Sequence, residues 1–349
     1  MKKIFFLIPV CFLLAVLNCF AQDIHFSQYY QSPLTLNPAL TSAGCDMRGL
    51  MNYKDQWGSV ASPFRTVAVS YEMALLKKKW KNGYVGAGIS DFNDKAGNSK
   101  MGMNQLNFSL SSIRKLDEKN NFAAGLQGGF AQRHFSTDNL HWDNQFSGTG
   151  FDPAIPSGEI FSSTGISYGD LAAGLLWSYG KGEMYSTAND DLKMNLGFSA
   201  FHVNSPKISF YGNDVRLDPR LVFHGRLSYG IKNSRTSIVP SFMFAKQGTQ
   251  QELIIGSMVR FRLKEDSKYT GFVKGSAISF GGYYRIQDAI VISSLVEIAR
   301  YAIGLSYDIN TSGLRTVSYG RGGLEISLRF ISPGPFSQGL TSSNPSFQK

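Results

Sequence analysis

Histidine is the residue type in this chain with the most versatile chemistry, because it binds metals and transfers protons near neutral pH. The five histidines are His25, His134, His141, His202 and His224. None of them shows the i, i+4 spacing that places two metal ligands on one helix face. Ser199 and His202 are close in sequence, but they fall on opposite faces of one predicted strand and cannot form a local nucleophile–base pair. A pairing across strands stays open at this level.

Two further ligand-binding motifs, one for phosphate and one for calcium, are incomplete in this sequence. Gly320, Gly322 and Gly323 do not make the phosphate-binding pattern GxGxxG, and no P-loop occurs. Asp91, Asn93 and Asp94 loosely resemble a calcium loop, but a lysine and an alanine follow where an oxygen ligand and a glycine belong. We therefore expect neither enzymatic activity nor a cofactor or bound metal.

The elements that position these residues begin behind an export signal. Residues 1–21 combine the basic Lys2 and Lys3 with a short apolar run and a small-x-small site ending at Ala21, which predicts a cleaved signal peptide. Lipidation of Cys19 is the alternative. Cleavage leaves Cys45 as the single cysteine, so no internal disulfide can form.

The chain is basic, with a formal charge of +10. Removal of the signal peptide lowers this charge by two. The densest basic cluster surrounds Trp80, between Lys77 and Lys81, and basic clusters can bind nucleic acid. An exported chain does not routinely meet nucleic acid, so we expect none as a partner. Anionic headgroups or a protein are the expected contacts.

Alternation of apolar and polar residues recurs over segments of about ten residues, as in 192–200, and indicates strands with one apolar face. No later stretch has the roughly 18 apolar residues of a membrane-spanning helix. The pattern predicts an all-β fold, a transmembrane antiparallel β-barrel of about fourteen strands, in which outer-membrane lipid contacts the apolar face. A soluble sandwich would need its apolar faces paired against each other. The predicted strands are 46–54, 64–73, 84–91, 104–112, 121–131, 169–179, 192–202, 220–231, 236–246, 252–262, 276–285, 289–297, 300–309 and 322–330.

Charges within these strands give a check, because a lysine or arginine at the midplane of the lipid face costs about 2 to 4 kcal/mol. All of the tested charges fall on the polar parity of their strands: Lys193, Arg226, Arg260, Glu325 and Arg329. Pro240 falls on the apolar parity and removes a ladder hydrogen bond, so we expect a β-bulge there.

The longest predicted connections, 132–168 and 203–219, fall at the same end of such a barrel, which we take to be the outer end. The last predicted strand resembles the signal read by barrel-assembly machinery, through Gly323, Ile326, Leu328 and the closing Phe330. This divides the chain into a signal peptide (1–21), an N-terminal segment (22–45), a barrel (46–330) and a flexible tail (331–349).

The N-terminal segment carries two motifs that are not strands. One is FSQY, formed by Phe26, Ser27, Gln28 and Tyr29; the other is LNPA, with Asn37 and Pro38 at its centre. Arg48 and the segment NYKDQW follow, with Tyr53, Gln56 and Trp57. Together with SYDIN at 306–310 and GRGGLEISL at 320–328, these motifs resemble the PorP/SprF family of type IX secretion system membrane proteins of the Bacteroidetes.

This resemblance implies an outer-membrane barrel that handles protein partners: a secreted adhesin with a C-terminal sorting domain, and periplasmic type IX secretion or peptidoglycan-binding components. The N-terminal motifs would then either plug the barrel or bind the partner directly. A hydrophobic-solute transporter of the fatty-acid type is the competing hypothesis, since it also combines about fourteen strands with a lumen hatch and an NPA element. A continuous apolar passage through the lumen would favour that transporter.

Overall fold

The computed structural model describes the chain from Asp23 to Pro333, with short gaps. The described residues are 23–59, 62–77, 79–80, 82–97, 99–137, 140–146, 148, 150–161, 163–181, 191–264, 275–313 and 315–333. The predicted signal peptide lies outside these residues, and so does the predicted tail beyond Pro333.

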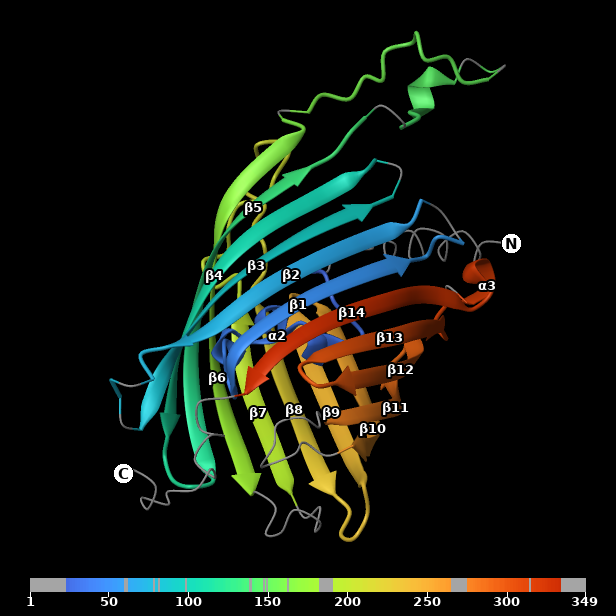
Figure 1. Ribbon diagram of the computed structural model, residues 1–349. Coiled ribbons are helices and arrows are strands. Elements are labelled where there is room, and N and C mark those ends of the chain that lie inside the picture. Colours follow the sequence, from blue (N-terminus) through green and yellow to red (C-terminus); the bar gives the residue numbers. More distant parts are fainter. Residues whose placement is uncertain are drawn as a thin grey trace, which may run out of the picture.

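Fourteen antiparallel strands close into one barrel, in which every strand pairs with its sequence neighbours and β1 pairs with β14 (Figure 1). The strands are β1 (Cys45–Gln56), β2 (Phe64–Leu75), β3 (Gly83–Ala96), β4 (Met101–Lys115), β5 (Asn120–His134), β6 (Gly165–Lys181), β7 (Leu192–Phe201), β8 (Arg220–Gly230), β9 (Thr236–Gln247), β10 (Gln250–Lys264), β11 (Ser276–Arg285), β12 (Ala289–Ile298), β13 (Tyr301–Asn310) and β14 (Arg321–Pro333). Closure leaves no unpaired sheet edge, as a membrane-spanning sheet requires. The predicted fold class is confirmed.

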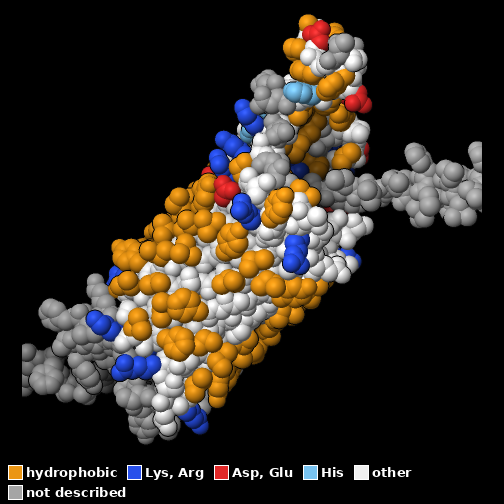
Figure 2. Space-filling model, turned by 90° about the vertical axis from the view of Figure 1, so that its right-hand side faces the viewer, with side chains coloured by type: hydrophobic (Ala, Val, Ile, Leu, Met, Phe, Trp, Pro, Cys, Tyr) orange, Lys and Arg blue, Asp and Glu red, His pale blue; other side chains and the backbone are white. Residues whose placement is uncertain are grey.

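The alternation seen in the sequence separates the two faces of the barrel wall. In β5, Leu126 and Phe130 are 68% and 58% exposed on the outer face, whereas the intervening Gln127 is buried in the lumen. Hydrophobic side chains spread over the outer surface between basic ends (Figure 2). The charged residues assigned to the polar parity do face the lumen. There, for example, Arg260 and Arg329 both form ion pairs with Glu297.

Two details differ from the sequence-based expectation. Several strands continue past their predicted ends, and β3 includes Asp91, Asn93 and Asp94. Beyond the lipid-facing band both faces can be polar, so the alternation disappears while the hydrogen-bonded ladder continues. The predicted bulge at Pro240 is wrong, because β8 and β9 keep the same register on both sides of it. Proline removes one donor here without adding a residue.

The two longest connections, 135–164 and 202–219, leave the barrel at the same end, called here the long-connection end. The first contains the 3-10 turn η3 (Asp143–Gln145), and the helix α3 (Arg315–Ser318) lies between β13 and β14 at this end too. The opposite end, where odd-numbered strands begin, is called the short-connection end. Within the described residues, no helix is long and apolar enough to cross a membrane.

The assignment of the outer face predicts the effect of a buried charge. Leu126→Arg should lower the free energy of unfolding by about 2 to 4 kcal/mol, since it places an arginine in the middle of the lipid-facing band. Leu116→Arg is the control, because Leu116 is similarly exposed at 65% but lies in the β4–β5 connection. Urea unfolding in lipid vesicles measures both, and equal losses would contradict the assignment.

Candidate functional site

Residues 23–44 run through the barrel lumen and are called the plug. They form the 3-10 turn η1 (Tyr29–Gln31), the helix α2 (Pro33–Leu36) and the 3-10 turn η2 (Pro38–Leu40), which lie inside the strands in Figure 1. The backbone amide of Asp23 donates to Gln247 at the end of β9, whereas Cys45 begins β1. The plug therefore crosses the lumen from the long-connection end to the short-connection end.

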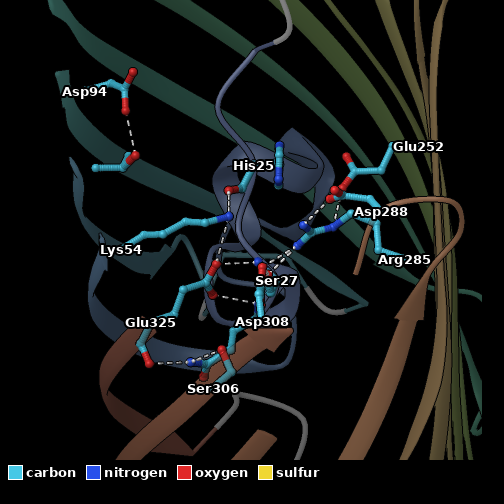
Figure 3. Close-up of polar contacts among 12 residues, drawn as sticks. His25, Ser27, Lys54, Asp94, Glu252, Arg285, Asp288, Ser306, Asp308 and Glu325 are labelled. Atoms are coloured by element: carbon cyan, nitrogen blue, oxygen red, sulfur yellow. Dashed lines mark hydrogen bonds and ion pairs between the residues drawn. The ribbon is translucent and has the colours of Figure 1, made fainter. Parts of the chain in front are cut away.

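The FSQY motif is held by carboxylates of the barrel wall (Figure 3). The backbone amides of Ser27 and Gln28 donate to the two carboxylate oxygens of Glu325, at 2.6 and 2.9 Å. The Ser27 hydroxyl donates to Asp308 at 2.7 Å. Because Glu325 and Asp308 are almost fully buried, these bonds and the neighbouring cations compensate for their lost hydration.

Two cations complete this cluster. Lys54 Nζ lies 3.3 Å from Glu325 and donates to the carbonyl of His25 at 3.0 Å. Arg285 lies 3.0 Å from Asp308 and also reaches the Ser27 hydroxyl. The two carboxylates and two cations, together with the plug amides, form one network, which is called here the charged anchor.

The other FSQY side chains pack against the wall. Gln28 donates to Ser306 and accepts from Ser327 at 2.9 Å. The Tyr29 hydroxyl contacts Ser241 at 3.1 Å, and Phe26 packs in a small apolar cluster with Phe92. All four motif residues are buried, so none presents its side chain at an outer surface.

Asn37 attaches the LNPA motif to the opposite wall. Its side-chain oxygen accepts from the amide of Ala39 and caps η2, with Pro38 in the first position where no N–H is needed. Its amide nitrogen donates to the carbonyls of Leu175 and Phe198, at 2.9 and 3.3 Å. Asn37 is fully buried, and its side-chain hydrogen bonds join η2 to β6 and β7.

Glycines in the wall make this approach possible. A Cβ on Gly125 would overlap the backbone of Pro38 and Ala39, and one on Gly174 would overlap the Asn37 side chain. Mid-strand glycine weakens a strand and often marks a close backbone approach. These two glycines therefore shape the wall to receive η2.

Arg48 acts with a residue that the sequence did not single out. It forms a two-pronged ion pair with Glu72, at 2.7 Å for its closer contact, and donates to the carbonyl of Leu40 at 2.8 Å. Glu72 also accepts from the amide of Ser42 at 2.6 Å. This contact fixes the end of the plug before it enters β1.

The structure does not bring the remaining predicted residues to the plug. Tyr53 faces outward from β1, and Gln56 and Trp57 lie at the long-connection end, where the Trp57 amide donates to Gly322. The terminal-strand residues stay in the wall: Gly323 pairs with Gln56, while the other three alternate on the outer face, namely Ile326, Leu328 and Phe330.

Several anchoring residues were missed by motif reasoning. Glu72 and Arg285 belong to no noticed motif, and Asp308 lies in the SYDIN segment but was not singled out; each lies at a lumen-facing position of an otherwise alternating strand. A charge at such a position needs a partner, because an unpaired buried charge is costly. A charged residue at a lumen-facing position of a predicted strand could therefore have been recognised in the sequence as an anchoring candidate, although its partner could not.

A second polar contact holds the start of the plug at the long-connection end. His202, just beyond β7, lies between Asp23 and Asp170, with Nδ1 at 2.8 Å from Asp170. Burial raises the pKa of Asp23, but the charge of His202 and its hydrogen bond outweigh this and hold the pKa at about 2. Burial lowers the pKa of His202, but the two carboxylates raise it to about 9. At neutral pH a cation is therefore held between two anions.

The polar contacts around the plug are hydrogen bonds and ion pairs between plug and wall. Within the part of the chain that the structure describes, no group of three His, Cys, Asp or Glu side chains could hold a metal ion. The plug divides the lumen: a cavity of about 450 Å³ lies toward the short-connection end, and one of about 30 Å³ lies beside Asp23 and His202.

These features define a class of protein, a closed fourteen-strand β-barrel of the outer-membrane type whose N-terminal segment fills the lumen. A family model described as "Type IX secretion system membrane protein PorP/SprF" matches residues 18–330. The chain belongs to this family and is an outer-membrane β-barrel. None of the curated proteins matches it.

Solved structures with similar barrels include the toluene transporter TbuX of Ralstonia pickettii, at 9% identity and a TM-score of 0.48, covering 86% of this chain and 94% of that one. A deletion mutant of the monoaromatic hydrocarbon channel TodX is 10% identical with a TM-score of 0.48, and the match covers 87% of this chain and 94% of that one. BamA from Haemophilus ducreyi is 10% identical with a TM-score of 0.37, and the match covers 82% of this chain and 70% of that one. Likenesses this distant carry no argument about function.

The close approach of η2 predicts that one methyl group at Gly125 disturbs the plug. Gly125→Ala should lower the free energy of unfolding by about 1 to 3 kcal/mol, as overpacking does, and speed hydrogen exchange of residues 23–44. Gly128→Ala in the same strand is the control, since its Cβ would meet only Leu171 at 3.7 Å. Mass spectrometry of exchanged peptides measures the difference, and equal behaviour of the two variants would contradict the prediction.

The Asp23–His202 pair predicts a pH window. A raised His202 pKa contributes stability that is full below 6.5 and lost as pH rises through about 9; a lowered Asp23 pKa contributes stability that is full above 3.8 and lost as pH falls through about 2. His202→Asn should thus lower the thermal midpoint more at pH 6 than at pH 10. Asparagine tolerates the positive φ of this position. A midpoint difference that is the same at both pH values would refute the assignment.

Proposed function

We propose that this protein is an accessory barrel of the type IX secretion system that binds, helps to export or anchors a secreted adhesin or sorting-domain protein, and that links it to periplasmic secretion components. The observation that carries the proposal is the match of the family model to residues 18–330. The expectation that the protein is not an enzyme belongs to the same proposal.

The filled lumen supports a protein-handling role over solute transport. A transporter of hydrophobic solutes needs a continuous apolar passage, but the plug is tied to the wall by the charged anchor and by Asn37. The larger cavity carries four cations on its wall. These features disfavour the competing transporter hypothesis.

A projection at the long-connection end offers a surface for a protein partner. It comprises the described residues between 135 and 161 together with the connection 205–216, and the part that contains η3 extends away from the barrel (Figure 1). Phe135 packs edge to face against Phe161 and Phe210, each with ring centroids 4.9 Å apart. This aromatic packing supports the projection from within.

The outer side of the projection leaves apolar groups uncovered. Ile160 is 85% exposed, Tyr211 58% and Phe146 55%. Exposed aromatic and aliphatic side chains on a supported scaffold are typical of protein-binding surfaces. We assign adhesin binding to this projection and periplasmic partners to the short-connection end, with the long-connection end facing outward.

Affinity purification of the tagged protein from detergent-solubilised outer membranes, followed by mass spectrometry, tests the proposal. We expect a large secreted adhesin together with periplasmic secretion components. Ile160→Asp should reduce adhesin recovery about ten-fold, the effect of losing a central apolar contact, and leave periplasmic components unchanged.

Tyr319→Asp is the matched control, because Tyr319 is 88% exposed at the same end but lies outside the projection, beside α3. Heat-modifiable gel mobility verifies that both variants form the barrel. Recovery of neither an adhesin nor a secretion component would refute the proposed function, and equal losses in both variants would refute the role of the projection.

A further inference from the structure

The cavity of about 450 Å³ below the plug has a strongly biased charge. Its wall includes Arg48, Lys193, Arg226 and Arg329, whereas none of the lining residues that the structure describes is acidic. The volume lies in the range of ordinary ligand sites. Four cations around a site with no carboxylate in its lining favour an anionic ligand.

Arg226 is the cation in this group for which the described part of the chain provides no anionic partner. Arg48, Lys193 and Arg329 each have a carboxylate within 4 Å. For Arg226, the described residues provide neither an ion pair nor a side-chain hydrogen bond; its guanidinium lies 5.1 Å from the centre of the Tyr30 ring. Arg226 therefore has its full set of donors available to a ligand.

Two buried donors beside Arg226 are also unsatisfied. The Tyr30 hydroxyl and Arg329 Nε have no hydrogen-bond partner among the described residues, and both side chains line the cavity. Burial raises the pKa of Tyr30 well above 10, so its hydroxyl keeps its proton and remains a donor. Leaving a buried donor unpaired costs about 1 to 3 kcal/mol, which an acceptor in the cavity would recover.

Apolar side chains also line part of the wall, among polar ones such as Asn195 and Ser178, and they indicate what accompanies the anionic group. Leu40 of the plug, Ile113 of β4 and Leu176 of β6 line the cavity. The strand segments around it are the starts of odd-numbered strands and the ends of even-numbered strands, so the cavity lies at the short-connection end. A ligand that carries a carboxylate beside an apolar group matches both parts of the wall.

We propose that this cavity binds a peptide carboxylate, either an acidic side chain or a chain terminus next to an apolar residue, which enters from the short-connection end. Arg226, Arg329 and Tyr30 donate to the carboxylate. The anionic ligand follows from the donors themselves, whereas the choice of a peptide rests on the proposed function.

Calorimetric titration of the full-length protein in detergent tests this site. The probe is a hexapeptide that ends in leucine and glutamate with a free C-terminus, and its uncharged twin ends in leucine and glutamine amide. We expect the acidic peptide to bind at least about ten-fold more tightly, because charge-assisted hydrogen bonds exceed neutral ones. High salt should reduce the difference.

Variants locate the binding. Arg226→Gln should lower the affinity for the acidic peptide about ten-fold, because it removes a charged donor. Tyr30→Phe should lower it about three-fold, because it removes a neutral donor. Lys232→Gln is the matched control, since Lys232 is exposed in the β8–β9 connection at the same end and outside the cavity lining. The affinity of the Lys232→Gln variant for the acidic peptide should be unchanged. Heat-modifiable mobility verifies folding of each variant.

Equal binding of the two peptides, or equal losses in Arg226→Gln and Lys232→Gln, would overturn the site. Binding of dodecanoate in place of the acidic peptide would overturn the choice of a peptide. If affinity purification recovers secretion partners while the acidic peptide fails to bind, only this inference falls. If the peptide binds at Arg226 but no secretion partner is recovered, the site stands and the proposed function falls.

Discussion

The carboxylate of Glu325, buried in the lumen, determines where the N-terminal segment lies. A buried anion is tolerated only where donors and cations replace its water, and among the described residues of the barrel wall Lys54 is the ion-pair partner of Glu325. The amides of Ser27 and Gln28 provide the missing donors, one to each oxygen. Glu72 repeats this arrangement at the other end of the plug, where Arg48 and the Ser42 amide share it. Without the plug, Glu325 and Glu72 would keep Lys54 and Arg48 as partners but would lose the backbone amides that complete their hydrogen bonding.

This mutual dependence bears on how the protein can act. A plug held by buried charge pairs and by the fully buried Asn37 is part of the barrel's stability, so its motifs serve structure before they serve a partner. In the proposed function, contact with other proteins falls to the two ends: the aromatic projection at the long-connection end and the basic cavity at the short-connection end. The separation of these surfaces suits an accessory protein that connects an outer partner with periplasmic components, as proposed above.

Local pattern was enough to predict much of the fold. Strand number, the outward parity of residues such as Leu126 and the position of the longest connections all follow from a two-residue period, which each strand carries in its own sequence. The FSQY and LNPA motifs also identified the segment that fills the lumen, but not what holds it. Motif reasoning named Tyr53, which faces outward, and passed over Lys54 beside it, which binds Glu325. The bulge expected at Pro240 does not form, because a missing donor alone does not shift a register.

By itself, the sequence determined that the chain is a fourteen-strand barrel with a separate N-terminal segment and a family signature at both ends. Only the tertiary structure decided how that segment crosses the lumen, which wall carboxylates receive it and which cations remain unpaired below it. The physical reason lies in the range of the interactions. The alternation of apolar and polar residues is a property of each strand's own sequence. Ser27 and Glu325, in contrast, are 298 residues apart and meet only when the barrel closes. The surplus donors of Arg226 and Tyr30 likewise become visible only once β8 and the plug lie side by side around the cavity.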